Sequence, residues 1–184
     1  MMFTADFDAA FAHTIGIEGG YSDNPNDPGG KTKFGVTERV ARKNGYIGDM
    51  REMPVEIAKE IAKREYWDSL SLDTVAGLSA PIAAELFDTG YNMGPPVAAR
   101  FLQEWLNAFN RRGQDYADIS SDGKIGPATT DALKQFLDKR GTAGTKVLLA
   151  ALNASQAARY LGVVEARPAS EDFIYGWISR RVLA

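Results

Sequence analysis

The sequence predicts a mainly α-helical fold with one small β-hairpin. Apolar residues recur at helical spacing along most of the 184 residues. Only one long loop, rich in Gly, Pro, Asn and Asp, interrupts this pattern early in the chain, and Phe34 and Val36 alternate with polar neighbours after it, as in a short strand. Hydrophobic residues make up 45% and charged residues 24% of the chain, which are ordinary globular values. The length suits one domain with a sizeable core, or one domain with a small appended lobe.

The first predicted helix covers residues 5–18, with Thr4 as its N-cap. One stripe of a 3.6-residue period places its last glutamate in line with side chains that should face the core: Phe7, Phe11, Ile15 and Glu18. Partial burial would raise the pKa of Glu18 and keep it protonated near neutral pH. The alternative is a glutamate that turns out into water, although the negative partial charge of a helix C-terminus disfavours that position.

Further helices are expected in order along the chain. Thr37 is a suitable N-cap and Gly45 a suitable stop for a short helix, and Pro54, Pro96 and Pro127 suit first turns. The expected ranges are about 38–44, 54–67, a helix opened at 79–81 that runs into 88–96, then 96–109, 127–139, 145–161 and 170–183.

Two of these ranges carry specific expectations. We expect residues 96–109 to be the buried central helix, in which Gln103 could face solvent. Residues 110–121 are polar and are interpreted as a linker. In the last helices the side chains expected to face inward are Leu133, Phe136, Leu137, Val147, Leu148, Ala151, Leu152 and Ala158.

Two adjacent motifs follow the first helix: Glu18-Gly19-Gly20-Tyr21 and Asp27-Pro28-Gly29-Gly30-Lys31-Thr32. They resemble glycoside hydrolase family 108, a lysozyme-like group of phage endolysins and bacterial N-acetylmuramidases. The spacing E-x8-D-x4-T is also similar to that of phage-type lysozymes, with the threonine one residue nearer. Further segments resemble the same family at residues 64–67, 87–95 and 173–180, and residues 122–130 resemble its C-terminal peptidoglycan-binding-like region.

The resemblance implies an α+β lysozyme-like fold in two regions packed as one compact unit. Residues 1–109 would be the catalytic region, with the hairpin and loop lobe beside the cleft, and residues 110–184 a helical peptidoglycan-binding-like region. Glu18 would be the general acid, Asp27 would help to activate a water, and Thr32 would hydrogen-bond that water. Turn chemistry is the alternative account of Asp27 and Thr32.

The same resemblance implies that Tyr21, Tyr66 and Asn92 bind substrate. Core packing is the alternative for Tyr66, since aromatic side chains pack cores as readily as they stack on sugars. A helix stop is the alternative for Asn92, because the glycine and prolines after it mark a boundary.

Composition removes several classes of function. The chain has no cysteine, so disulfides, thiolate metal sites and cysteine nucleophiles are excluded. His13 is its only histidine, which we interpret as a surface or boundary residue, so a His-rich zinc site cannot be built and a Ser-His-Asp triad would depend on it alone. A net charge of −3 without a basic run argues against nucleic acid. No cofactor and no metal are implied.

The sequence therefore predicts a peptidoglycan hydrolase that cleaves the β-1,4 bond between N-acetylmuramic acid and N-acetylglucosamine, for phage lysis or for wall remodelling. The alternatives are a lytic transglycosylase and a non-catalytic wall-binding or secretion-associated protein on a lysozyme scaffold. We expect a monomer whose partners are peptidoglycan glycan strands.

The expected localisation follows from the start of the chain. Asp6 and Asp8 interrupt the candidate signal peptide, and no segment reaches the ~18 apolar residues of a membrane span. The expectation is synthesis in the bacterial cytoplasm, no membrane insertion, and action in the periplasm or wall after release by a holin or a secretion system.

Overall fold

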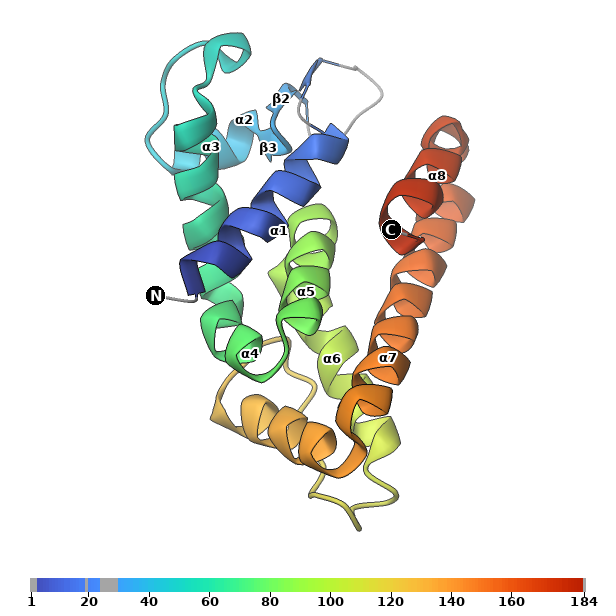
Figure 1. Cartoon of the computed structure of the whole chain (residues 1–184). Coiled ribbons are helices and arrows are strands. Elements are labelled where there is room, and N and C mark those ends of the chain that lie inside the picture. The colour runs from blue at the N-terminus through green and yellow to red at the C-terminus, as the bar shows by residue number, and fades with distance from the viewer. Residues whose placement is uncertain (1–2, 19, 24–29, 184) are drawn as a thin grey trace.

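Helix α5, Ala80–Met93, runs through the middle of the molecule in the computed structural model, which describes residues 3–18, 20–23 and 30–183 (Figure 1). It contacts α1, α4, α6 and α7 and buries most of its length. Small residues permit this close approach: a Cβ added at Gly90 would lie 2.9 Å from Leu70 Cδ1. The prediction that residues 96–109 form the central helix was wrong, because α6, Pro95–Phe109, keeps an exposed face that includes Arg100 and Glu104.

The first helix and the hairpin lobe agree with the sequence, except that α1 begins at Phe3, so the prediction of Thr4 as its N-cap was wrong. Helix α1 covers Phe3–Glu18, and strands β1 (Tyr21–Ser22), β2 (Thr32–Lys33) and β3 (Val36–Thr37) form an antiparallel sheet in that order. Ser22 pairs with Thr32, which in turn pairs with Thr37. The side chain of Thr37 caps α2, Glu38–Lys43, by accepting a hydrogen bond from the Val40 amide at 3.4 Å.

The predicted helix at residues 54–67 is confirmed, with a change of pitch. A single 3-10 turn, Met50–Glu52, leads into α3, Val55–Ala62, which continues through a π-helical turn at Lys63–Trp67 and a 3-10 turn at Asp68–Leu70 into α4, Leu72–Leu78. Trp67 is fully buried and its ring meets Phe7 and Phe87 edge-on, at centroid distances of 5.4 and 5.7 Å. In the Tyr66–Trp67 pair at the end of this helix, Trp67 is therefore a core residue.

The two helices predicted at 127–139 and 145–161 are confirmed as the two arms of α7, Pro127–Ala166. The chain bends between them at Gly141, whose φ of 56° and ψ of −147° are not helical. A 3-10 turn at Pro168–Ser170 leads to α8, Glu171–Trp177, and a π-helical turn at Ile178–Val182.

The inward face of the second arm differs from the prediction. Val147 is 53% exposed and Ala158 is also exposed, so both expectations were wrong. The buried stripe instead consists of Leu148, Leu152, Gln156 and Tyr160. Gln156 is polar, so an apolar pattern does not include it. It nevertheless lies four residues after Leu152 and therefore on the same packed face of the helix.

Residues 110–121 are packed on α6 rather than forming a free linker. The side chain of Asn107 holds Ile119 through both backbone groups, at 2.8 and 2.9 Å, and the Tyr116 hydroxyl donates to the Leu106 carbonyl at 2.7 Å. Polar composition alone does not reveal this packing, since the hydrogen bonds join residues from different segments.

The solvent-facing interpretation of Gln103 was also wrong, because this residue is 1% exposed. Its amide accepts from the Gly123 backbone at 2.9 Å and donates to Asp122 Oδ1, the Lys124 carbonyl and Thr129 Oγ1 at 3.0, 2.9 and 3.2 Å. Gln103 thus fastens the turn at residues 122–130 to α6.

Helix α7 is long and apolar enough to span a membrane if only length and composition are considered. One 18-residue window has a mean hydropathy of 1.3, and 22% of it is buried. Core helices pass the same test, and the buried stripe of α7 packs on α5 and α6 across the bend at Gly141.

Candidate active site

A groove of about 420 Å³ lies where the sheet meets the end of α5 and the C-terminal helices. Its first wall comes from the sheet and α5: Thr32, Gly35, Thr37, Tyr91, Asn92 and Met93. Its second wall, called here the C-terminal wall, consists of Arg159, Tyr160 and Val163 on α7 and Trp177 on α8. Figure 1 shows the sheet and α8 at the same end of the molecule, with the end of α5 between them.

Two predicted site residues from separate segments line this groove together. Thr32 lies on β2, partly buried, and its hydroxyl donates to the Gly30 carbonyl at 3.1 Å. Asn92 lies exposed in the last turn of α5, where its amide nitrogen donates to the Asp88 carbonyl at 2.8 Å. The groove therefore joins two of the motifs that the sequence separates by 60 positions.

The hairpin turn and α5 meet with almost no space between them. Gly35 has a φ of +78°, and a Cβ added there would lie 2.3 Å from Tyr91 Cε1. The Tyr91 hydroxyl donates to the Phe34 carbonyl at 2.7 Å. Only glycine fits both the backbone conformation and the contact, so this position sets how closely the first wall is assembled.

The two predicted tyrosines do not line the groove. Tyr66 lies behind it, with its ring 4.7 Å from that of Tyr91, and burial raises its pKa. Tyr21 lies on β1 with the Arg51 guanidinium 4.9 Å from its ring centroid, and its hydroxyl donates to Asp23 Oδ2 at 3.2 Å. Packing thus accounts for the position of Tyr66.

The two predicted catalytic carboxylates are those of Glu18 and Asp27. Helix α1 ends at Glu18, in agreement with the predicted range of residues 5–18, and β1 begins shortly after it at Tyr21. The side chain of Glu18 and the whole of Asp27 lie outside the described residues. Their catalytic roles stay predictions.

A buried polar cluster lies behind the groove, and sequence reasoning missed it. Arg181 forms an ion pair with Asp88, and Gln156 Nε2 donates to Asp88 Oδ2 at 2.9 Å. One turn earlier on α5, Glu85 accepts from the Thr89 hydroxyl at 3.1 Å. Burial, followed by the negative charge of Asp88, raises the pKa of Glu85 to about 7. Two features of the sequence could have indicated this cluster: Gln156 occupies a position of the apolar stripe, and the acidic residue Asp88 directly follows Phe87.

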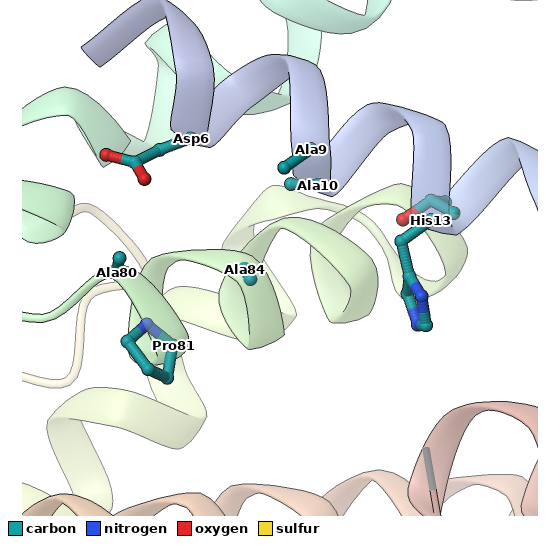
Figure 2. A pocket seen from close by; sticks show the side chains of 8 residues that line it. Asp6, Ala9, Ala10, His13, Ala80, Pro81 and Ala84 are labelled. Atoms are coloured by element: carbon teal, nitrogen blue, oxygen red, sulfur yellow. The ribbon is translucent and has the colours of Figure 1, made fainter. Parts of the chain in front are cut away.

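A second hollow, of about 300 Å³, lies between α1 and the start of α5. Figure 2 shows Asp6 and His13 toward opposite ends of it, with the small residues Ala9, Ala10 and Ala84 between them and Ala80 at the Asp6 end. His13 is exposed, as expected, and it has no acid partner among the residues that the structure describes. A Ser-His-Asp triad therefore finds no support here.

The described residues also contain no group of three His, Asp or Glu side chains placed to hold a metal ion. The expectation that the protein needs no metal or cofactor stays a prediction.

Comparison with known proteins identifies both parts of the chain. Residues 11–94 match the family described as glycosyl hydrolase 108, and residues 97–182 match one described as "Predicted Peptidoglycan domain". The chain therefore carries a glycosyl hydrolase 108 region followed by a peptidoglycan region. It is thus a glycoside hydrolase, and its second region supports binding to peptidoglycan. The matched regions meet near residues 94–97, whereas the predicted boundary at 109/110 stays a prediction.

A solved structure has the same overall fold as this chain. The structure of Brucella abortus SagA superposes with a TM-score of 0.71 at 25% sequence identity, over 97% of this chain and 92% of that one. The comparison with curated proteins found no match. The mainly α-helical fold with a small antiparallel sheet is therefore confirmed.

Proposed function

We propose that the protein is an N-acetylmuramidase that hydrolyses the β-1,4 bond between N-acetylmuramic acid and N-acetylglucosamine. The observation that carries this proposal is the meeting of Thr32 and Asn92 in one groove, within the region that matches family 108. The peptidoglycan region contributes the opposite wall of that groove. A long polymer with polar hydroxyl and acetamido groups suits a groove lined by both polar and aromatic side chains.

The proposed mechanism assigns one task to each residue of the E-x8-D-x4-T pattern. Glu18 protonates the leaving glycosidic oxygen, and Asp27 takes a proton from the attacking water. The Thr32 hydroxyl orients that water from the groove wall. Asn92 holds an acetamido or hydroxyl group through its side-chain amide.

This mechanism predicts inversion at the anomeric carbon, because a water must fit between the two carboxyl groups. Inverting glycosidases hold them about 6.5–9.5 Å apart, and retaining enzymes about 5–5.5 Å. NMR of the first product formed from a defined glycan oligomer distinguishes the two outcomes. Retained configuration would contradict the role of Asp27.

The test is muropeptide analysis of purified peptidoglycan treated with the wild-type chain and with Glu18→Gln. We expect N-acetylmuramic acid reducing ends from the wild type, and at least a ~100-fold loss in the variant, because a missing general acid costs about 10²–10⁴ in rate. Glu104→Gln, on the exposed face of α6, is the matched control and should keep full activity.

The two rival functions give different products in the same experiment. A lytic transglycosylase yields anhydro-muramic acid ends, because the sugar's own hydroxyl replaces water. A non-catalytic scaffold yields no cleavage with either chain. Full activity of Glu18→Gln, with its circular dichroism spectrum intact, would remove Glu18 from the mechanism.

We also propose a route to the cell wall and a role there. Synthesis in the cytoplasm requires a holin or a secretion system to bring the enzyme to the wall, where it serves phage lysis or local remodelling as a monomer. Fractionation of producing cells with and without a co-expressed holin tests the route. Activity outside the cytoplasm without any such system would contradict it.

A further inference from the structure

The C-terminal wall of the groove contains a tryptophan with an unusual environment for this chain. The indole N–H groups of Trp67 and Trp105 donate to Asp73 Oδ1 at 2.7 Å and to Ser155 Oγ at 2.8 Å. Trp177 is partly exposed and lines the groove, and its N–H has no acceptor within the described ranges. It therefore offers both apolar ring surface and a hydrogen-bond donor to a ligand in the groove.

Stacked rings hold this tryptophan in place. Its ring lies 5.0 Å from that of Tyr160 at an interplanar angle of 28°, and 6.0 Å from that of Phe173 at 19°. Tyr160 is buried and belongs to the packed stripe of α7. A ring backed in this way loses little conformational entropy when a ligand covers its remaining surface.

A positive charge accompanies the tryptophan on the same wall. Arg159 is exposed and lines the groove, and it makes no ion pair with any residue that the structure describes. Arg181, by contrast, is buried and paired with Asp88. The whole chain carries a net charge of −3, which disfavours anions in general. A guanidinium in the groove supplies a local positive charge that attracts an anionic substrate group.

Buried contacts behind the groove hold the C-terminal segment that carries Trp177 against α5. Four residues after Trp177, Arg181 pairs with Asp88 of α5, beside Gln156 of α7. The wall thus consists of two helices linked to α5 by buried polar contacts.

We propose that Trp177 and Arg159 form a substrate subsite in which the indole packs on a pyranose ring while the guanidinium binds a substrate carboxylate. This inference rests on the proposed function, since it takes the groove as the glycan-binding site. The region matched as a peptidoglycan domain then acts as one half of the substrate groove, and its contribution is the recognition of a sugar with a nearby acidic group.

Peptidoglycan offers such a carboxylate from two sources. The stem peptide carries free carboxylates, and a glycan stripped of its peptide carries a free lactyl carboxylate on each muramic acid. Chitooligosaccharides are β-1,4-linked like peptidoglycan glycan but consist of N-acetylglucosamine alone, so they carry neither group. These three ligands separate ring packing from charge recognition.

Binding is measured by calorimetry with full-length protein in the Glu18→Gln background, which prevents turnover. Trp177→Ala should weaken binding of all three ligands about tenfold, as expected for an aromatic contact worth about one decade of affinity. Tyr175→Ala is the matched control, because Tyr175 is 84% exposed on the same helix and does not line the groove. It should bind as the parent does.

Arg159→Gln should weaken binding of the carboxylate-bearing ligands by up to about fivefold at low salt, and the difference should shrink as salt is added. Binding of chitooligosaccharides should be unchanged. A loss confined to peptide-bearing glycan assigns the stem peptide, and a loss confined to stripped glycan assigns the lactyl group. Arg180→Gln, an exposed arginine off the groove, is the charge control.

Tryptophan fluorescence supplies a readout that a purely structural role would not change. Ligand should shift the emission of the parent chain, and Trp177→Phe should remove that shift while preserving the ring stack and some affinity. Unchanged affinity in Trp177→Ala, or equal effects of Arg159→Gln on all three ligands, would overturn the subsite. Binding without cleavage by the wild type would instead refute the proposed hydrolysis and leave the subsite standing.

Discussion

Arg181 and Asp88, 93 positions apart in the chain, form a buried ion pair that ties the last turn of the protein to its central helix. The Arg181 side chain is 1% exposed, and the Asp88 carboxylate also accepts from Gln156. Asp88 lies one turn before Asn92, which lines the groove. The pair therefore connects the C-terminal wall to the helix that forms the opposite wall.

Replacing Arg181 with methionine should lower the free energy of unfolding by about 3–5 kcal/mol, because it leaves the Asp88 carboxylate buried beside Glu85 without its cation. Urea denaturation measures the loss. Arg180→Met, on an exposed arginine, should change stability by less than about 0.5 kcal/mol. Adding Asp88→Asn to Arg181→Met should recover part of the loss, and a double variant as unstable as the sum of both single changes would contradict the coupling.

Glu85→Gln should stabilise the protein at high pH and have little effect at low pH. The folded pKa of about 7 lies above the ordinary value of 4.5, so the folded chain holds more protons than the unfolded chain between these values. The free energy of unfolding of the wild type therefore falls as the pH rises through this window, by up to about 3 kcal/mol. The variant removes this term.

Thermal unfolding of both chains from pH 4 to pH 8 measures the difference. The gap should open above about pH 5 and level off above about pH 7. Glu104→Gln, on the exposed face of α6, should follow the wild-type curve. Parallel curves for wild type and Glu85→Gln would show that Glu85 titrates normally.

Gln103→Ala should cost about 2–4 kcal/mol, since it opens a cavity and leaves the Gly123 amide and the Lys124 carbonyl without their partner. Hydrogen exchange should report faster opening of the turn at residues 122–126 than of helix α7. Gln135→Ala, at an exposed position of α7, is the matched control. Equal stability of the two variants would mean that Gln103 does not anchor this turn.

Gly35→Ala should reduce both stability and glycan cleavage more than Gly45→Ala does. Both glycines have positive φ, so an alanine strains the backbone by roughly 1–2 kcal/mol at either site. At Gly35 the new methyl group also meets the Tyr91 ring, whereas nothing lies within 4 Å of the Cβ position at Gly45. The excess effect at Gly35, measured by thermal unfolding and by activity, reports the contact between the two segments of the first groove wall.

Local pattern predicted most of the helices and the hairpin. Capping residues, prolines in first turns and 3.6-residue stripes act within a few residues, so α1, α2 and both arms of α7 could be read from the chain. The same reasoning failed at Gln103, Val147 and Ala158, where burial depends on which face a distant segment covers.

The sequence by itself determined the helical fold, the family motifs and two residues, Thr32 and Asn92, that belong to one groove. Only the tertiary structure decided that α5 is the central helix, that Arg181 and Gln156 meet Asp88, and that Trp177 lines the same groove as Thr32. The physical reason is range: capping and periodicity are properties of neighbouring residues, whereas burial and ion pairing join residues that only the folded chain brings together.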